Sequence, residues 1–194
     1  MKDLSLHLMD IAQNSTTANA TIIQIILSIT GSPKQLMMTL TDNGCGMDSE
    51  FLVRVTDPFT TTRTTRNVGL GIPLLKLSSE LAGGDFTILS EKGKGTTITA
   101  SFLVNSIDRI PLGDMPETIS SLMTAWTDIE WIVHLECGEN IFHITTSDIK
   151  DVLGDVPLNN PAVYGWLNGT LQEAIMTVFG GNLDEIIEGS GSHS

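Results

Sequence analysis

Apolar positions recur with a helical period at the start of the chain. Residues 4–18 place an apolar or small side chain at every third or fourth position, as one core-facing helix stripe requires; they are Leu4, Leu8, Ile11, Ser15 and Ala18. The neighbouring face is polar and carries His7, Asp10 and Asn14. Asn19 then stands where many helices end in the left-handed conformation, which asparagine tolerates. The pattern predicts one amphipathic helix with a polar face.

Strand-like segments dominate the rest of the first half. Four segments are rich in β-branched and apolar residues and are bounded by turn residues, which is typical of strands; they cover residues 21–30, 35–41, 85–90 and 95–104. Two helices are predicted between the second and third strands, at about residues 48–55 and 69–81. Gly83 and Gly84 end the longer helix. The first half is therefore predicted to be an α/β unit with four strands.

Two helices are predicted in the second half, one on each side of a strand pair. The first begins where Asp114 and Glu117 have the spacing of a capping box, and it continues to about Trp126. The second begins at Asn160, which is followed by a proline of the kind tolerated in a first helical turn, and it ends at Gly180. This order of elements predicts an α+β extension.

The strand pair lies within residues 129–146. Its loop is Gly138 and Glu139, and glycine at the first loop position suits a type II′ hairpin. Two strands with one apolar face are too small to fold alone, so we expect the pair to dock on the sheet edge of the first half. His134 and His143 then become cross-strand neighbours. Two histidines without a third ligand are more typical of a surface than of a metal site.

Charge divides the chain into two halves. Residues 1–104 hold 8 Lys or Arg and 9 Asp or Glu, a net charge of −1, and residues 105–194 hold 2 and 14, a net charge of −12, which together give the total of −13. The change predicts a first domain over residues 1–104 and an acidic extension over residues 105–188. Residues 189–194 have the composition of a linker or tag. A negative surface repels nucleic acid and anionic lipid, so neither is expected as a partner.

Composition and cysteine use limit the class of protein further. Of the 194 residues, 41% are hydrophobic, which is typical of a folded globule. The most apolar stretch, residues 22–29, is interrupted by Gln24 and Ser28 and is too short to span a bilayer. The charged N-terminus lacks a signal-peptide core, and Cys45 and Cys137 form no CxxC pair. We therefore expect a cytoplasmic protein; no pattern in the sequence indicates its oligomeric state.

Asp10 and Asn14 are the first candidates for chemistry. They are one helical turn apart, so their side chains project side by side. An amide oxygen can ligate Mg²⁺ that is held by nucleotide phosphates. A carboxylate one turn earlier can orient or deprotonate an attacking water or hydroxyl. A solvent-facing helix surface explains the same pair, and spacing alone does not decide between the two.

Glycine-rich motifs follow at three places. They are DNGCGM at residues 42–47, NVGLGI at residues 67–72 and GKGTT at residues 93–97. The carboxylate of Asp42 can accept a hydrogen bond from the amine of adenine, and the glycines after it let the backbone approach a planar base. The N–H groups of the helix that NVGLGI opens favour phosphate. A plain turn or hairpin explains each motif taken alone.

Together and in this order, the motifs resemble the histidine kinase-like ATPase superfamily, whose members share the Bergerat nucleotide-binding fold. LMDIAQNSTTANA is similar to the N box, DNGCGM to the G1 box, DPFTTT to the F box, NVGLGIPLLK to the G2 box and GKGTTITASF to the G3 box. The resemblance covers about residues 3–104 and is nearest to bacterial sensor kinases and anti-sigma serine kinases. It implies a two-layer α/β sandwich in which a mixed sheet has helices on one face.

The resemblance also implies a role for each matching residue. Asn14 would bind Mg²⁺, and Asp10 would be the catalytic base. The residues at the adenine end would be Asp42, Gly44, Gly46 and Thr96. The residues that present backbone amides to the phosphates would be Gly69, Leu70 and Gly71.

Residues 57–68 match the ATP lid of the superfamily. Phe59 would anchor the hinge of this lid. Hydroxyls offer donors with or without ligand, and arginines neutralise phosphate charge; the residues on the phosphate side would be Thr60, Thr61, Thr62, Arg63 and Arg66. Ordinary surface charge is the alternative for the two arginines.

The resemblance implies a protein that binds ATP with Mg²⁺ and acts as a protein kinase or ATPase on a separate, unidentified protein partner. A non-catalytic module that senses ATP or ADP is the alternative. Asp10 stands where many relatives that hydrolyse ATP carry the longer glutamate, which favours the alternative. We expect no phosphoacceptor helix ahead of the N box. His7, expected on the surface of the first helix or at the edge of the site, is a poor phosphoacceptor.

Overall fold

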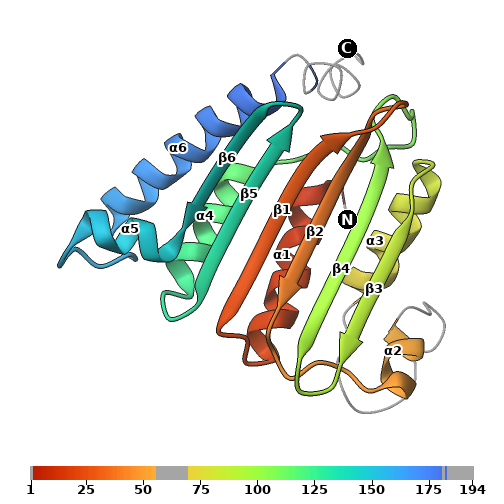
Figure 1. Ribbon diagram of the computed structural model, residues 1–194, viewed down its shortest axis with the longest axis horizontal. Helices are drawn as coiled ribbons and strands as arrows, with labels where there is room; N and C mark the ends of the chain where they lie inside the picture. The colour runs from red at the N-terminus through yellow and green to blue at the C-terminus, as the bar shows by residue number, and fades with distance from the viewer. Residues whose placement is uncertain (1, 56–69, 181, 183–194) are drawn as a thin grey trace.

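The computed structural model describes residues 2–55, 70–180 and 182, which form a six-stranded mixed sheet with helices packed on one face (Figure 1). The strands are β1 (Ile22–Thr30), β2 (Gln35–Asp42), β3 (Phe86–Glu91), β4 (Gly95–Leu103), β5 (Glu130–Cys137) and β6 (Asn140–Thr145). The helices are α1 (Leu4–Thr17), α2 (Ser49–Val55), α3 (Gly71–Leu81), α4 (Met115–Ala125), α5 (Thr146–Leu153) and α6 (Pro161–Phe179). The predicted two-layer α/β sandwich is confirmed.

The strand order in the sheet is β3-β4-β2-β1-β5-β6. β1 and β5 run parallel, and every other neighbouring pair is antiparallel. The four strands expected in the first half are therefore contiguous, and the hairpin of the second half extends them at β1. The division of the chain into domains at residue 104 stays a prediction.

The sheet buries one face because apolar side chains alternate along its strands. In β2, Leu36, Met38 and Leu40 are buried, and the residues between them are half-buried. The same period in β1 buries Ile23 and Ile25. α1, α3, α4 and α6 cover this face (Figure 1), with α1 between α3 and α4 and with α6 packed against α4. α1 thus lies in the middle of the helix layer, where its polar edge meets the start of α3.

The second half shares one core with the first. β5 pairs with β1 from Ile22 opposite Glu130 to Ile29 opposite Cys137. Trp131 in β5 is fully buried, and its indole N–H donates to the carbonyl of Trp126 at 3.2 Å. Side chains from both halves belong to a single buried cluster. Burial of this kind is the main favourable term in folding, so the two halves stabilise each other.

A loop from the second half also fixes the first turn of α1. The N–H of Leu4 donates to the carbonyl of Pro111 at 2.9 Å, and the N–H of Ser5 donates to the carbonyl of Leu112 at 3.0 Å. The carboxylate of Asp3 accepts from the N–H of Leu6 at 3.0 Å as the N-cap. These contacts satisfy N–H groups that have no partner inside a helix.

The turns agree with the sequence-based predictions at two special positions. Asn19 has a φ of 57°, as expected after a helix end. Gly138 has a φ of 62°, which fits the first loop position of a type II′ hairpin. The structure adds one helix that the pattern analysis did not predict, α5, directly after β6. Its signal was present, because Thr145 and Asp148 form a reciprocal capping box at its start.

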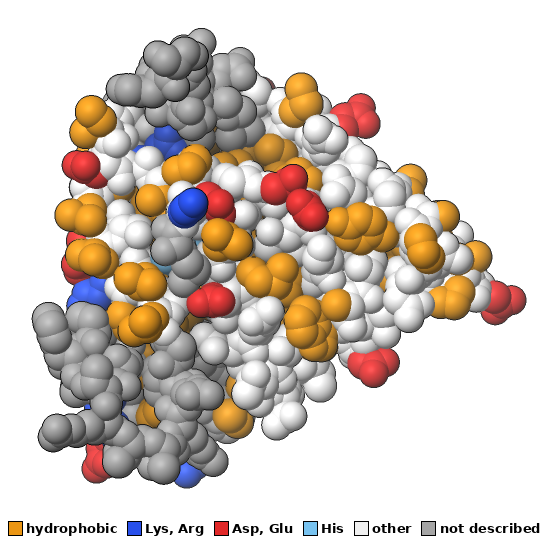
Figure 2. Space-filling view, turned by 180° about the vertical axis from the view of Figure 1, so that it is seen from behind, with side chains coloured by type: hydrophobic (Ala, Val, Ile, Leu, Met, Phe, Trp, Pro, Cys, Tyr) orange, Lys and Arg blue, Asp and Glu red, His pale blue; other side chains and the backbone are white. Residues whose placement is uncertain are grey.

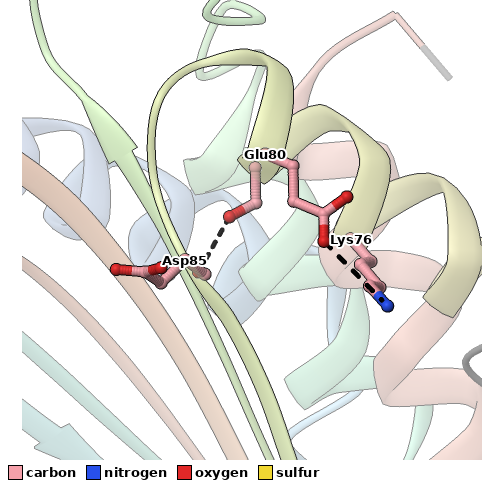
Figure 3. A network of polar contacts seen from close by, with 4 residues as sticks. Lys76, Glu80 and Asp85 are labelled. Carbon is pink, nitrogen blue, oxygen red and sulfur yellow. Dashed lines mark hydrogen bonds and ion pairs between the residues drawn. The ribbon is translucent and has the colours of Figure 1, made fainter.

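The end of α3 is fixed to β4 by a small polar network. The hydroxyl of Ser79 lies 2.8 Å from the carbonyls of both Asp85 and Ser101. On the exposed side, Lys76 and Glu80 form an ion pair of 3.9 Å one turn apart (Figure 3). Such an exposed pair contributes about 0.3–0.5 kcal/mol, so the buried serine matters more for the position of α3.

Hydrophobic side chains are dispersed over the helix side of the molecule (Figure 2). Exposed apolar residues of the helices include Leu77 and Leu81 of α3 and Trp166 and Met176 of α6. Among the described helices, none has both the length and the apolar character needed to cross a bilayer.

Candidate functional site

Asp10 on α1 lies against the first residue of α3. A Cβ added to Gly71 would lie 2.8 Å from a carboxylate oxygen of Asp10 and 3.0 Å from its Cβ. α3 has no side-chain cap at Leu70, so within the described chain its first N–H groups are not satisfied by a capping side chain. A helix start of this kind attracts negative charge. Glycine at position 71 is therefore what allows Asp10 and the helix start to come together.

Asp42 at the end of β2 is buried, with 7% of its surface exposed. One carboxylate oxygen accepts from the hydroxyl of Ser15 on α1 at 2.6 Å. The other accepts from the N–H of Gly44 at 2.8 Å. A buried carboxylate is stable only when it is hydrogen-bonded, and these two donors meet that requirement while fixing its orientation.

Three glycines near Asp42 pack closely against neighbouring chain segments. A Cβ added to Gly44 would lie 2.9 Å from Ala18, and one added to Gly46, whose φ is +61°, would lie 2.0 Å from the carbonyl oxygen of Glu91. Gly95 approaches the carbonyl of Asp42 as closely, at 1.9 Å for the added Cβ. Protein atoms already occupy the position of each added Cβ, so these glycines let the chain segments around Asp42 pack closely and fix its place.

Thr96 stands opposite Asp42 in the pairing of β2 with β4. Its hydroxyl lies 2.9 Å from the hydroxyl of Ser90 on β3. The Ser90 oxygen also accepts from the N–H of Met47 at 2.8 Å. A chain of hydroxyls thus connects the end of the sheet with the segment that follows β2.

Asn14 is exposed on α1, one turn after Asp10. Magnesium prefers oxygen ligands and, when bound with a nucleotide, takes most of them from phosphates and water. One exposed amide oxygen fits this limited demand. In the described chain, no group of three or more His, Cys, Asp or Glu could hold a metal ion. His134 and His143 are cross-strand neighbours, and no third ligand of these types completes a group with them there.

His7 lies one turn before Asp10 but is only 1% exposed, so the expected surface position is wrong, and the alternative position at the edge of the site agrees with its place near Asp10 and Gly71. Neither ring nitrogen has a hydrogen-bond partner among the described residues, although the main chain of Gly71 lies near the ring. Burial lowers the pKa of His7 below its ordinary value of 6.5, and the charge of Asp10 opposes this shift. The imidazole is therefore neutral at pH 7.

The lowered pKa of His7 predicts a loss of stability in mild acid. As the pH falls below 6.5, the unfolded chain takes up a proton on His7 before the folded chain does, so the free energy of unfolding decreases. For His7→Leu we expect this decrease to be smaller by up to about 1.4 kcal/mol per pH unit at pH values well below 6.5, where the unfolded chain is fully protonated at His7. Urea unfolding at several pH values measures the slope. His143→Gln, which alters an exposed histidine, is the control, and equal slopes for His7→Leu and the unaltered chain would contradict the prediction.

The remaining predicted site residues lie outside the described residues; they are Phe59, Thr60, Thr61, Thr62, Arg63, Arg66 and Gly69. Within the described chain, Asp10 of α1 lies against Gly71 at the start of α3, and Ser15 of the same helix bonds to Asp42 beside Gly44 at the end of β2. Asn14 lies between Asp10 and Ser15 along α1. The roles of all these residues stay predictions.

The sequence analysis missed two side chains that support the site. Ser15 was counted only as part of the core stripe of α1, yet it donates to Asp42. Its polarity on an otherwise apolar stripe was the available signal. Asn43 was not singled out, and its carboxamide oxygen accepts from the N–H groups of Thr21 and Ile22, both at 2.9 Å. This contact holds the start of β1 beside the end of β2.

Comparison with known families now assigns the class of protein. Residues 2–106 match the family described as "Histidine kinase-, DNA gyrase B-, and HSP90-like ATPase". The match covers more than half of the chain, and the chain belongs to this family. The predicted resemblance is confirmed.

Curated relatives of the chain are bacterial sensor proteins. A sensor protein of Shewanella frigidimarina (strain NCIMB 400) is 36% identical over 103 residues, which are 52% of this chain and 16% of that protein. The signal transduction histidine-protein kinase AtoS of Escherichia coli (strain K12) is 34% identical over 74 residues, which are 38% of this chain and 12% of that protein. The chain thus spans less than a fifth of the length of these relatives.

A solved structure described as the N-terminal domain of a DNA repair protein resembles a larger part of the chain. Its TM-score is 0.50 at 16% sequence identity, and the likeness covers 94% of this chain and 59% of that one. At this identity the likeness concerns the fold alone. It includes the second half of the chain, which the family match does not reach.

Proposed function

We propose that the chain binds ATP with Mg²⁺ and uses it as a protein kinase or ATPase that acts on a separate protein. The observation that carries this proposal is the placement of Asp10 beside Gly71 at the start of α3. Among the described residues this helix start has no side-chain cap, and a terminal phosphate with its attacking group needs both a carboxylate and N–H donors. Membership of the ATPase family supports the choice of nucleotide.

Each described residue then has a distinct part in binding. The carboxylate of Asp42 accepts a hydrogen bond from the amine of adenine, and the N–H of Gly44 holds that carboxylate in place. The amide oxygen of Asn14 ligates Mg²⁺, which supplies charge neutralisation for the phosphates when bound. The first N–H groups of α3 hold phosphate oxygens.

Asp10 is the residue that we assign to the chemical step. Its carboxylate accepts a proton from, or orients, the hydroxyl or water that attacks the terminal phosphorus. If a partner's side chain attacks, the phosphoryl group is transferred to the partner; if water attacks, phosphate is released. In both cases the bond between the terminal phosphorus and the bridging oxygen breaks, and ADP leaves. The bacterial sensor proteins among the relatives support a partner protein in a signalling system.

Incubation with γ-labelled ATP and Mg²⁺ tests the proposal, with and without candidate partner proteins. We expect released phosphate or a labelled partner, and we expect Asp10→Asn to abolish either product while ATP still binds. The matched control is Asp85→Asn, which makes the same change at an exposed site away from α1. ATP binding with neither product would contradict catalysis and leave binding intact.

A nucleotide-sensing module without catalysis is the second candidate, and one observation favours it. The first turn of α1 is hydrogen-bonded to Pro111 and Leu112 of the second half. α1 also carries Asp10 and Asn14, so a shift of α1 on nucleotide binding would reach the acidic half directly. For this candidate, the γ-label experiment gives no product, and partner binding depends on whether ATP or ADP is present.

Substitution of Asn14 tests the metal assignment. We expect Asn14→Ala to weaken ATP binding about tenfold in Mg²⁺, because the metal loses its protein ligand. In EDTA the variant and the unaltered chain should bind ATP equally. Calorimetry in both buffers measures this difference. Gln13→Ala, which changes the adjacent exposed residue of α1, is the control; unchanged affinity of Asn14→Ala in Mg²⁺ would remove Asn14 from the metal site.

A further inference from the structure

Ser15 connects the first helix to the end of the second strand across 27 positions of sequence. Ser15 is 3% exposed, and its hydroxyl lies 2.6 Å from Oδ2 of Asp42. The carbonyl of Ile11, the other acceptor within reach, is 3.4 Å away. The shorter contact has the length of a charge-assisted hydrogen bond, so the Ser15 proton is directed to Asp42.

The contact limits what Asp42 can do. An ionised carboxylate offers about four acceptor positions. Ser15 occupies one on Oδ2, and the N–H of Gly44 occupies one on Oδ1. Held at both oxygens, the carboxylate keeps one orientation, and its remaining acceptor positions point in fixed directions.

We propose that Ser15 is a specificity-determining residue of the nucleotide site, which fixes Asp42 so that it accepts from the adenine amine and repels a base with a carbonyl at that position. This inference rests on the proposed function. Ser15 does not itself contact the base; it acts through Asp42. A carboxylate has no proton to offer a carbonyl, so a fixed carboxylate discriminates by leaving that carbonyl unpaired.

Ser15 and Asn14 are neighbours on the same turn of α1. It directly follows Asn14, and successive helix residues point about 100° apart. The exposed side of this turn carries the Mg²⁺ ligand, and the buried side carries the support for the base-reading carboxylate. One rigid helical turn thus sets the distance between the metal end and the base end of the site.

Calorimetry with ATP and with ITP, both in Mg²⁺, tests the inference. ITP differs from ATP in having a carbonyl in place of the amine. For Ser15→Ala we expect ATP to bind about tenfold more weakly, as the loss of a hydrogen bond to a charged group predicts. The affinity for ITP should change less than twofold. Thr16→Ala is the matched control, because within the described chain its hydroxyl donates to the helix carbonyl of Gln13 and not to Asp42.

Two further variants separate specificity from folding. Ser15→Cys keeps nearly the same size but replaces a strong donor with a weak one, so it should lose ATP affinity as Ser15→Ala does. In an Asp42→Asn background, Ser15→Ala should weaken ATP binding no further, because both changes remove the same interaction. Thermal unfolding confirms that each variant is folded before binding is compared.

The outcomes distinguish this inference from the proposed function. If the unaltered chain binds ATP and Ser15→Ala binds it equally well, or weakens ATP and ITP by the same factor, the inference is overturned and the function stands. Additive losses in the double variant overturn it as well. If the unaltered chain does not bind ATP at all, the proposed function fails and the inference fails with it.

Discussion

Residues 1–105 expressed alone should give an insoluble chain or one without cooperative thermal unfolding. The cut removes β5, which pairs with β1 over eight residue pairs, and it removes α4, which packs against α1. It also removes the carbonyls of Pro111 and Leu112, which accept from the first turn of α1. Ile25 and Leu27 of β1, fully buried in the whole chain, would then lie at a sheet edge.

The expected loss of folding free energy is large compared with the net stability of a domain. Net stabilities of domains are about 5–15 kcal/mol, and the truncation removes a fully buried tryptophan along with the side chains packed around it. An unpaired edge strand is also a template for aggregation. A chain ending at residue 180, after α6, is the matched control and should unfold cooperatively.

Differential scanning calorimetry and size-exclusion chromatography of the two chains measure the effect. A soluble 1–105 fragment that melts cooperatively near the midpoint of the whole chain would contradict the prediction. In that case the first half would be an independent domain, and β5 and β6 would only cover its edge.

Asp42→Asn should weaken ATP binding by about tenfold to a hundredfold. Hydrogen bonds to charged groups contribute about 1.5–3 kcal/mol each, and about 1.4 kcal/mol corresponds to a factor of ten in affinity. The amide can keep one oxygen for the N–H of Gly44. Its NH₂ group can donate to the Ser15 hydroxyl, which also accepts, but toward the adenine amine a donor would meet a donor.

Calorimetry with ATP and GTP measures the effect of this substitution on each base. We expect ATP to lose affinity and GTP, which has a carbonyl where adenine has its amine, to lose much less. Asp85→Asn makes the same charge change at an exposed position and serves as the control. Equal losses for both nucleotides would remove Asp42 from the adenine site.

Much of the site could be predicted from the sequence because its residues lie in short contiguous motifs. Asp10 and Asn14 are one turn apart on one helix, and helical periodicity places them on the same face whatever packs around them. The glycines after Asp42 are marked by close approach and, at Gly46, by a positive φ, which few other residues tolerate. Local constraints of this kind depend on neighbouring residues alone.

Other features became evident only from the tertiary structure. Periodicity indicated that one face of the β5–β6 hairpin is buried, and it did not indicate that β5 pairs in parallel with β1. The spacing of His7 places it on the polar face of α1, yet its side chain is buried, with the main chain of Gly71 at the start of α3 close to its ring. Both depend on which element lies next to a face, and the spacing of residues within an element does not contain that information.

Ser15 shows the division between sequence and structure most clearly. The sequence determined that it lies on the buried stripe of α1, because its spacing from Leu8 and Ile11 is that of a helix. Only the fold decided that this stripe ends beside Asp42, where the hydroxyl has a carboxylate to bond. A hydrogen bond between residues 27 positions apart requires the sheet and the helix layer to be assembled first, since packing of the two layers sets the distance between them.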